Sequence, residues 1–197
     1  MSPKNLNVSN KTHKNLLNNL RDRKILQIYK KFESIVDLNQ DFIVAVSGGS
    51  DSLSLTFLSK VYSIKKSLNV YYFIIDHKLR KNSSFEAKTA KNILKKYNIR
   101  LKILRWNGKK PNSNIQSSAR NKRYNLLINQ AKKLNVKNIL TGHHIDDLYE
   151  NFFIRISRGS GLNGLVSFGK KTQNRNINLL RPLINFEKKH LNYVTSK

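Results

Sequence analysis

Residues 42–54 read FIVAVSGGSDSLS, and this stretch decides the fold. Five apolar residues run straight into the turn Ser47-Gly48-Gly49-Ser50-Asp51-Ser52, after which apolar residues return at helical spacing, at Leu53, Phe57, Leu58 and Val61. The pattern predicts a buried β-strand, a tight glycine turn and the start of an α-helix. Glycines allow close backbone approach, and N–H groups at a helix start attract anions, so we expect the turn to hold a phosphate chain.

The turn does not match the two common nucleotide-binding patterns. No lysine follows the glycines, as a Walker A loop requires, and the spacing Gly-x-Gly-x-x-Gly is absent. The hexapeptide resembles instead the SGGxDS loop of the ATP pyrophosphatase (PP-loop) superfamily, whose members break ATP between the α and β phosphates and adenylate a substrate oxygen. The alternative is an ordinary serine-rich turn.

Outward from this stretch, apolar runs alternate with segments of helical periodicity. They predict an α/β fold with a doubly wound, mainly parallel five-stranded sheet and helices on both faces. Four of the strands are expected at 42–46, 70–75, 100–105 and 136–141. Helices are expected at 13–36 with a break near Asp22, and at 52–67, 84–97, 116–134 and 187–194. Residues 170–175 are interpreted as a basic loop, residues 152–156 as a helix, and the glycine-rich segment 159–164 as a mobile flap or a loop that allows close approach.

Three parts of the chain are expected. Residues 1–40 would form a disordered arm and a helix, 41–185 a PP-loop catalytic domain, and 186–197 the start of a short or truncated helical extension. The sequence contains no cysteine, which excludes disulfides, thiolate metal sites, iron–sulfur clusters and cysteine nucleophiles. No apolar run approaches the roughly 18 residues of a membrane span, so we expect no membrane association and a cytoplasmic or organelle-stromal location.

The net charge of +27 suggests a polyanionic partner such as RNA. A codon bias toward Lys, Asn and Ile in an AT-rich genome is an equally simple explanation. The positions of the acids are more informative, because five of the eleven lie at or just beyond the ends of expected strands: Asp51, Asp76, Asp146, Asp147 and Glu150. Open α/β sheets bind ligands at that edge.

Basic and acidic groups follow the other strands. Asp76, His77 and Arg80 come directly after the second strand, where an Asp can orient a ribose or hold a metal and an Arg can meet phosphate, unless the segment is a solvated loop. Arg120 and Arg123 lie near a helix start, where they oppose the helix dipole, so we expect an anion to hold them there.

The fourth strand leads into two histidines and three acids, at His143, His144, Asp146, Asp147 and Glu150. Imidazoles beside carboxylates can bind a divalent metal or move protons. The alternative is that the acids simply complement the dipole of the helix they begin.

Taken in order, these segments resemble the tRNA(Ile)-lysidine synthetase family over about residues 40–185. The matching segments are 47–52, 76–80, Arg120 with Arg123 and Tyr124, 142–150, 158–165 and 181–183. The resemblance implies a ligase that adenylates C2 of the wobble cytidine in the CAU anticodon of tRNA(Ile). Free L-lysine would then displace AMP and form lysidine.

The resemblance also implies the cofactors and the site. ATP and Mg²⁺ would be required, with the nucleotide bound by Ser47, Gly48, Gly49, Ser50, Asp51, Ser52, Asp76 and His77, and the metal by Asp51. The implied catalytic groups are Asp51, Arg120, His143 and Asp147. The implied substrate contacts are Arg80, Arg123, Asp146, Asp147, Glu150 and Arg158. The partners would be tRNA(Ile), free L-lysine and a second copy of the chain in a homodimer.

Three rival functions share the loop. An NAD or GMP synthetase-like enzyme would adenylate a small acceptor, and a non-catalytic tRNA-binding relic would keep the loop without turnover. A tRNA thiolase is disfavoured because sulfur transfer in that class depends on cysteines, which are absent here.

Overall fold

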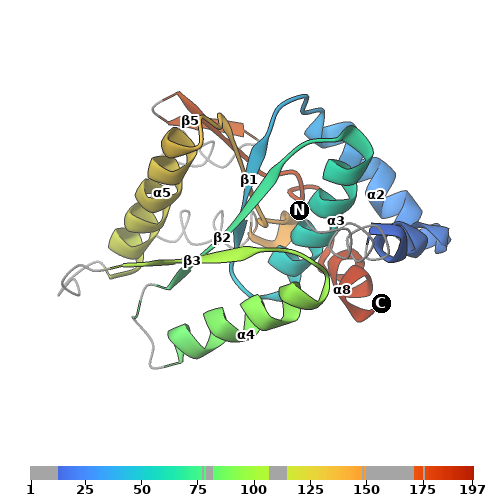
Figure 1. Ribbon diagram of the computed structural model, residues 1–197, viewed down its shortest axis with the longest axis horizontal. Coiled ribbons are helices and arrows are strands. Elements are labelled where there is room, and N and C mark those ends of the chain that lie inside the picture. The colour runs from blue at the N-terminus through green and yellow to red at the C-terminus, as the bar shows by residue number, and fades with distance from the viewer. Residues whose placement is uncertain are drawn as a thin grey trace, which may run out of the picture.

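A computed structural model describes residues 13–76, 78, 82–106, 115–147, 149, 171–174 and 176–197, with the side chains of 115–119 excepted. The chain forms a six-stranded sheet in the order β3-β2-β1-β4-β6-β5 (Figure 1). The strands are β1 Phe42–Val46, β2 Val70–Asp76, β3 Leu101–Arg105, β4 Asn138–Thr141, β5 Lys171–Asn174 and β6 Ile177–Leu180. All neighbouring strands are parallel except β5 with β6, so the predicted mainly parallel α/β sheet is confirmed.

The helices lie close to their predicted ranges. They are α2 Arg23–Val36, α3 Ser50–Lys66, α4 Ser83–Lys96, α5 Ile115–Lys133 and α8 Lys188–Ser196, preceded by the short 3₁₀ helix η1 Asn19–Arg21. The predicted break near Asp22 is confirmed. The Asp22 carboxylate accepts hydrogen bonds from the N–H groups of Lys24 and Ile25 and so caps α2.

The sheet has a hydrophobic core on each face. Along β1, Phe42 and Val44 pack into the core formed with α2, α3, α4 and α8, whereas Ile43 packs into the core formed with α5. Figure 1 shows α5 on one side of the sheet and α3 and α4 on the other. Burial on both faces explains why the central strands read as continuous apolar runs.

The strand order brings two distant turns together. From β1 the chain passes to β2 and then β3 on one side, whereas β4 pairs with the opposite side of β1, with Phe42 against Asn138 and Ala45 against Thr141. The turns that follow β1 and β4 therefore meet at the carboxyl edge of the sheet. Such a reversal of strand order is where open α/β sheets form their ligand crevice.

One element was predicted wrongly. Residues 170–175 were interpreted as a basic loop, but Lys171–Asn174 form β5, which pairs antiparallel with β6 and gives the sheet a sixth strand. All four residues are exposed and polar, so the strand lacks the apolar alternation by which a sequence reveals a strand. The predicted helix at 152–156 and the glycine-rich segment 159–164 lie outside the described residues.

The predicted tail helix is confirmed as α8, and it packs into the core. Leu191 and Val194 are buried, and the Ser54 hydroxyl of α3 donates a hydrogen bond of 2.7 Å to the Leu191 carbonyl. The division into parts at 1–40, 41–185 and 186–197 stays a prediction. Within the described ranges, no helix combines the length and the apolar character that a membrane span needs.

Candidate active site

The hydroxyl of Ser52 holds the turn between β1 and α3. Its Oγ accepts hydrogen bonds from the N–H groups of Ser47 and Gly48, both at 3.1 Å, and donates one to the Gly49 carbonyl at 3.0 Å. The Ser47 hydroxyl lies 3.0 Å from the same oxygen. Gly48 has a φ of +89°, a conformation that side chains rarely adopt, so this position requires glycine.

Asp51 lies in the first turn of α3, immediately beyond this bend. Gly49 is the N-cap of the helix, in extended backbone. The N–H groups of a first helical turn have no acceptor within the helix, and the helix dipole adds positive potential in front of them. The bend and the helix start therefore form a suitable place for a phosphate group.

The turn after β4 lies directly against this helix start. A Cβ added to Gly142 would stand 3.1 Å from the Cα and 3.2 Å from the backbone nitrogen of Ser52. Any other residue would have to push the two backbones apart by a few tenths of an ångström. The motif that begins at Gly142 is thereby held against the motif that ends at Ser52.

His144 connects the acids of the two turns. The ring is buried, with Nε2 3.3 Å from Asp51 Oδ2 and 3.8 Å from Asp147 Oδ2. The Asp146 N–H donates a hydrogen bond of 3.2 Å to Nδ1, and Asp146 Oδ2 lies 3.5 Å from the same nitrogen. Asp147 Oδ2 also accepts the His144 N–H at 2.8 Å.

A cavity of about 240 Å³ opens between the two turns. Six residues predicted for the site line it: Ser47, Asp51, Ser52, Arg123, His143 and Asp147. Tyr124, Thr141 and Gly142 complete its polar and backbone wall, and apolar side chains of β1, β2 and α5 form its floor. The structure thus brings together the carboxylates that the sequence placed at two different strand ends.

His143 faces this cavity, and its pKa is lowered to about 4. Burial is the main cause, because the low dielectric disfavours the charged ring; Asp147 opposes the shift, while Arg181, Arg120 and Arg123 add to it. Its Nδ1 lies 2.9 Å from the Thr141 hydroxyl. At neutral pH the ring is therefore uncharged.

Three arginines lie at or near the cavity, but Arg120 and Arg181 do not line it. Arg123 lines it, and the Arg120 guanidinium lies 5.7 Å from the centre of the Tyr124 ring. Arg181 is buried, donates a hydrogen bond of 2.6 Å to the Thr172 hydroxyl of β5 and is hydrogen-bonded to Tyr124. Burial lowers the pKa of Arg181, although an arginine remains charged.

Asp76 lies at the end of β2 but does not line the cavity. Its carboxylate accepts hydrogen bonds from the hydroxyls of Ser83 at 2.8 Å and Ser84 at 2.5 Å and from the Lys78 N–H at 3.2 Å. Burial alone would raise its pKa, but these hydrogen bonds outweigh that effect and lower it. In this structure the side chain fixes the start of α4, and its predicted nucleotide contact stays a prediction.

The remaining predicted positions are less informative. The Asp146 side chain is 57% exposed and does not line the cavity. His77, Arg80, Glu150 and Arg158 lie outside the described residues, so their predicted roles stay predictions.

Four residues at the site were missing from the predicted set: Gly142, His144, Arg181 and Lys188. The first three belong to motifs that the sequence displays, but only the fold shows which atoms they contact. Lys188 does not belong to any of these motifs. It begins α8, and its Nζ lies 3.7 Å from Asp51 Oδ2.

Few side chains at this site could bind a metal ion directly. Among the described residues, no group of three or more His, Cys, Asp or Glu side chains is arranged to hold a metal ion. Mg²⁺ is commonly held by one or two carboxylates together with substrate phosphates and water, and Asp51 meets that requirement.

Comparison with known proteins gives a consistent result. The model of the PP-loop domain, an ATP-binding family, matches residues 17–197. The tRNA(Ile)-lysidine synthase of Orientia tsutsugamushi (strain Boryong) is 40% identical over 153 residues, covering 78% of this chain and 34% of the relative. That of Rhodopseudomonas palustris is 36% identical over 151 residues, covering 76% and 44%. The chain thus spans less than half the length of these curated relatives.

Two solved structures share the fold. The U34-tRNA thiolase NcsA from Methanococcus maripaludis, with its [4Fe-4S] cluster, aligns over 89% of this chain and 64% of that one, with a TM-score of 0.77 and 17% identity. The FMN adenylyltransferase of Candida glabrata, in complex with FMN and an ATP analogue, aligns over 96% and 65%, with a TM-score of 0.57 and 13% identity. At these identities the likeness concerns the fold alone.

Proposed function

Because this chain belongs to the family of PP-loop domains, we propose that it binds ATP at the bend 47–52 and adenylates the C2 oxygen of the wobble cytidine of a tRNA(Ile) bearing CAU. Free L-lysine then completes lysidine. The observation that carries this proposal is the shared cavity, because it places the phosphate-binding bend, two carboxylates and an uncharged imidazole around one space. The similarity to tRNA(Ile)-lysidine synthases supports the choice of substrate.

In the first step, the cytidine oxygen attacks the α-phosphorus and the bond to the β-phosphate breaks, releasing pyrophosphate. The first turn of α3 binds the leaving group with its N–H groups, and Arg120 balances phosphate charge. Mg²⁺, held by Asp51, would supply further charge neutralisation on the phosphates. Asp76 and His77 are proposed to contact the nucleoside.

In the second step, the ε-amine of lysine attacks C2, AMP leaves and the nitrogen loses a proton. Asp147 and Glu150 are proposed to bind the amines of lysine, because a cationic substrate requires carboxylates. His143 and Asp147 face the same cavity, and one of them is proposed to take up the proton that the attacking nitrogen loses. Arg80, Arg123, Asp146 and Arg158 are proposed as RNA or substrate contacts. The reaction would take place wherever tRNA is present, in the cytoplasm or an organelle stroma.

The test is lysine-dependent release of AMP. The protein is incubated with α-labelled ATP, Mg²⁺, lysine and an unmodified tRNA(Ile) transcript, and AMP, pyrophosphate and the modified base are measured. AMP formation that needs both lysine and the tRNA is expected. AMP formation with ammonia and a small carboxylic acid would identify the synthetase rival, and tRNA binding without ATP use would identify the relic.

Two substitutions separate the steps. Asp51→Ala is expected to abolish pyrophosphate release, because the metal and the phosphates lose their carboxylate. Asp147→Ala is expected to preserve adenylation and to raise the KM for lysine by about tenfold or more, the usual effect of removing a charged hydrogen-bond partner. Asp41→Ala, at the opposite end of β1, is the control and should match the unsubstituted protein. Unchanged lysine kinetics in Asp147→Ala would contradict its assigned role.

A further inference from the structure

The outward side of α4 combines an exposed aromatic ring with lysines. Phe85 is 70% exposed. Lys88, Asn92, Lys95 and Lys96 are exposed on the same helix, and together with Phe85 they define the α4 face. At 100° per residue these five side chains lie within about 100° of one another around the helix axis. The only acid in α4 is Glu86.

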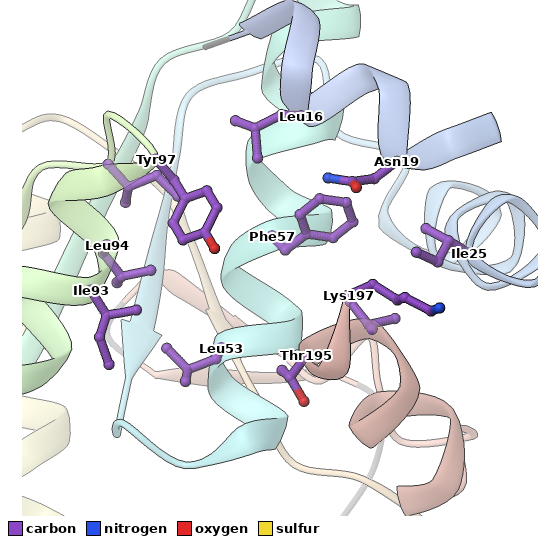
Figure 2. A pocket seen from close by; sticks show the side chains of 12 residues that line it. Leu16, Asn19, Ile25, Leu53, Phe57, Ile93, Leu94, Tyr97, Thr195 and Lys197 are labelled. Carbon is purple, nitrogen blue, oxygen red and sulfur yellow. The ribbon is translucent and has the colours of Figure 1, made fainter. Parts of the chain in front are cut away.

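Packing among the described residues does not explain Phe85. The helix buries its opposite side, through Ser83, Ala87, Ala90 and Leu94. Ile93 and Tyr97, also exposed apolar residues of this segment, turn toward α3 and line an apolar cavity of about 140 Å³ with Leu53 and Phe57 (Figure 2). Phe85 lies at the other end of the helix and does not line this cavity.

The α4 face is continuous with the candidate active site. A hollow of about 360 Å³ is lined by the bend residues Ser47, Gly48 and Gly49 on one side and by Phe85, Glu86 and Thr89 of α4 on the other. A base stacked on Phe85 therefore lies beside the bend assigned to ATP, with the lysines of the α4 face farther along the helix.

We propose that the α4 face binds the RNA substrate next to the reacting base, an inference that rests on the proposed function. Phe85 stacks on an unpaired base, and Lys88, Lys95 and Lys96 neutralise neighbouring phosphates. Aromatic rings interleaved with cations are the usual platform for single-stranded nucleic acid, and an anticodon loop presents such bases. A second copy of the chain fits poorly, because it would bring the same lysines face to face.

Direct binding measurements test this surface. An unmodified tRNA(Ile) transcript is titrated with each protein by fluorescence anisotropy over a range of salt concentrations, without ATP or lysine, so that the result does not depend on turnover. Phe85→Ala is expected to weaken binding by about fivefold or more with little change in salt dependence, because it removes stacking and no charge. Lys88→Ala with Lys95→Ala is expected to reduce the slope of log K against log salt by about 1.5.

The matched control is Lys132→Ala with Lys133→Ala, an exposed lysine pair at the end of α5 on the other face of the sheet. It should retain more affinity than the α4 pair. Equal losses in the two pairs, or no binding of the tRNA by the unsubstituted protein, would overturn the proposal. A loss of Mg²⁺–ATP affinity in Phe85→Ala with tRNA affinity intact would also overturn the proposal. The same holds if Phe85→Ala converts a dimer to a monomer in sedimentation and leaves tRNA affinity unchanged. Failure of lysine-dependent AMP release with these binding results intact would overturn only the proposed function.

Discussion

At the scale of single residues, His144 determines where the Asp51 carboxylate points. Asp146 holds one nitrogen of the ring and the other faces Asp51, 3.3 Å away. His144→Leu is expected to lower the rate of AMP formation by about tenfold or more, since the polar contact of the ring with the Asp51 carboxylate is lost. His144→Gln keeps an N–H donor and should retain most of the rate. The measurement is AMP release against Mg²⁺ concentration, and equal losses in the two variants would contradict a positioning role.

His143 makes stability depend on pH. Its pKa is about 4 in the folded protein and near 6.5 when unfolded, so the unfolded chain binds more protons between these values. The stability that comes from keeping this ring uncharged is fully present above about pH 6.5 and is lost as the pH falls toward 4. The free energy of unfolding falls by at most about 3 kcal/mol, because the ring is partly exposed.

Urea unfolding at about pH 7 and about pH 4.5 measures this effect. His143→Asn should lose less stability across this interval than the unsubstituted protein. An NMR titration of the His143 ring should show its midpoint well below 6.5. A midpoint at or above that value would contradict the assigned burial.

At the scale of elements, the site depends on the contact between the β4 turn and the start of α3. In Gly142→Ala, the new methyl group would meet the backbone of Ser52 at 3.1 Å, and backbone atoms cannot move aside as a flexible side chain can. We expect the free energy of unfolding to fall by about 1–3 kcal/mol and ATP affinity to weaken.

Gly49→Ala provides the comparison for stability. A methyl group there would meet only the Ser47 hydroxyl at 3.8 Å, an ordinary contact, and Gly49 has a φ of −76°, which alanine adopts without strain. Denaturant unfolding should therefore show a much smaller loss for Gly49→Ala than for Gly142→Ala. Similar losses of stability in the two variants would show that the close approach of Gly142 to the Ser52 backbone does not limit stability.

At the scale of the whole molecule, α8 joins the C-terminal segment to the core and to the site. Leu191 is fully buried against α3, while Lys188 reaches Asp51. Leu191→Ala is expected to reduce the free energy of unfolding by about 2–4 kcal/mol through lost burial and the cavity left behind. The exposed neighbour Asn192→Ala should change it by less than about 0.5 kcal/mol in the same denaturation experiment.

Much of this molecule could be predicted from sequence because its central elements have strong periodicity. The strand 42–46, the glycine bend and the helices follow directly from apolar spacing. Strand β5 could not be predicted, because Lys171–Asn174 gain their conformation from pairing with β6 and not from their own pattern. Nor could spacing tell His144 from His143, since the turn geometry decides which ring is buried beside Asp51 and which faces the cavity.

The Ser52 hydroxyl bridges the bend through hydrogen bonds to Ser47, Gly48 and Gly49, so contacts within the protein itself fix the curvature of this segment. A phosphate that enters meets a rigid receptor and does not have to organise a flexible loop, which removes an entropic penalty from association. We therefore expect the nucleotide to associate rapidly, without a slow rearrangement of the backbone. Its affinity should depend on the strength of the new contacts.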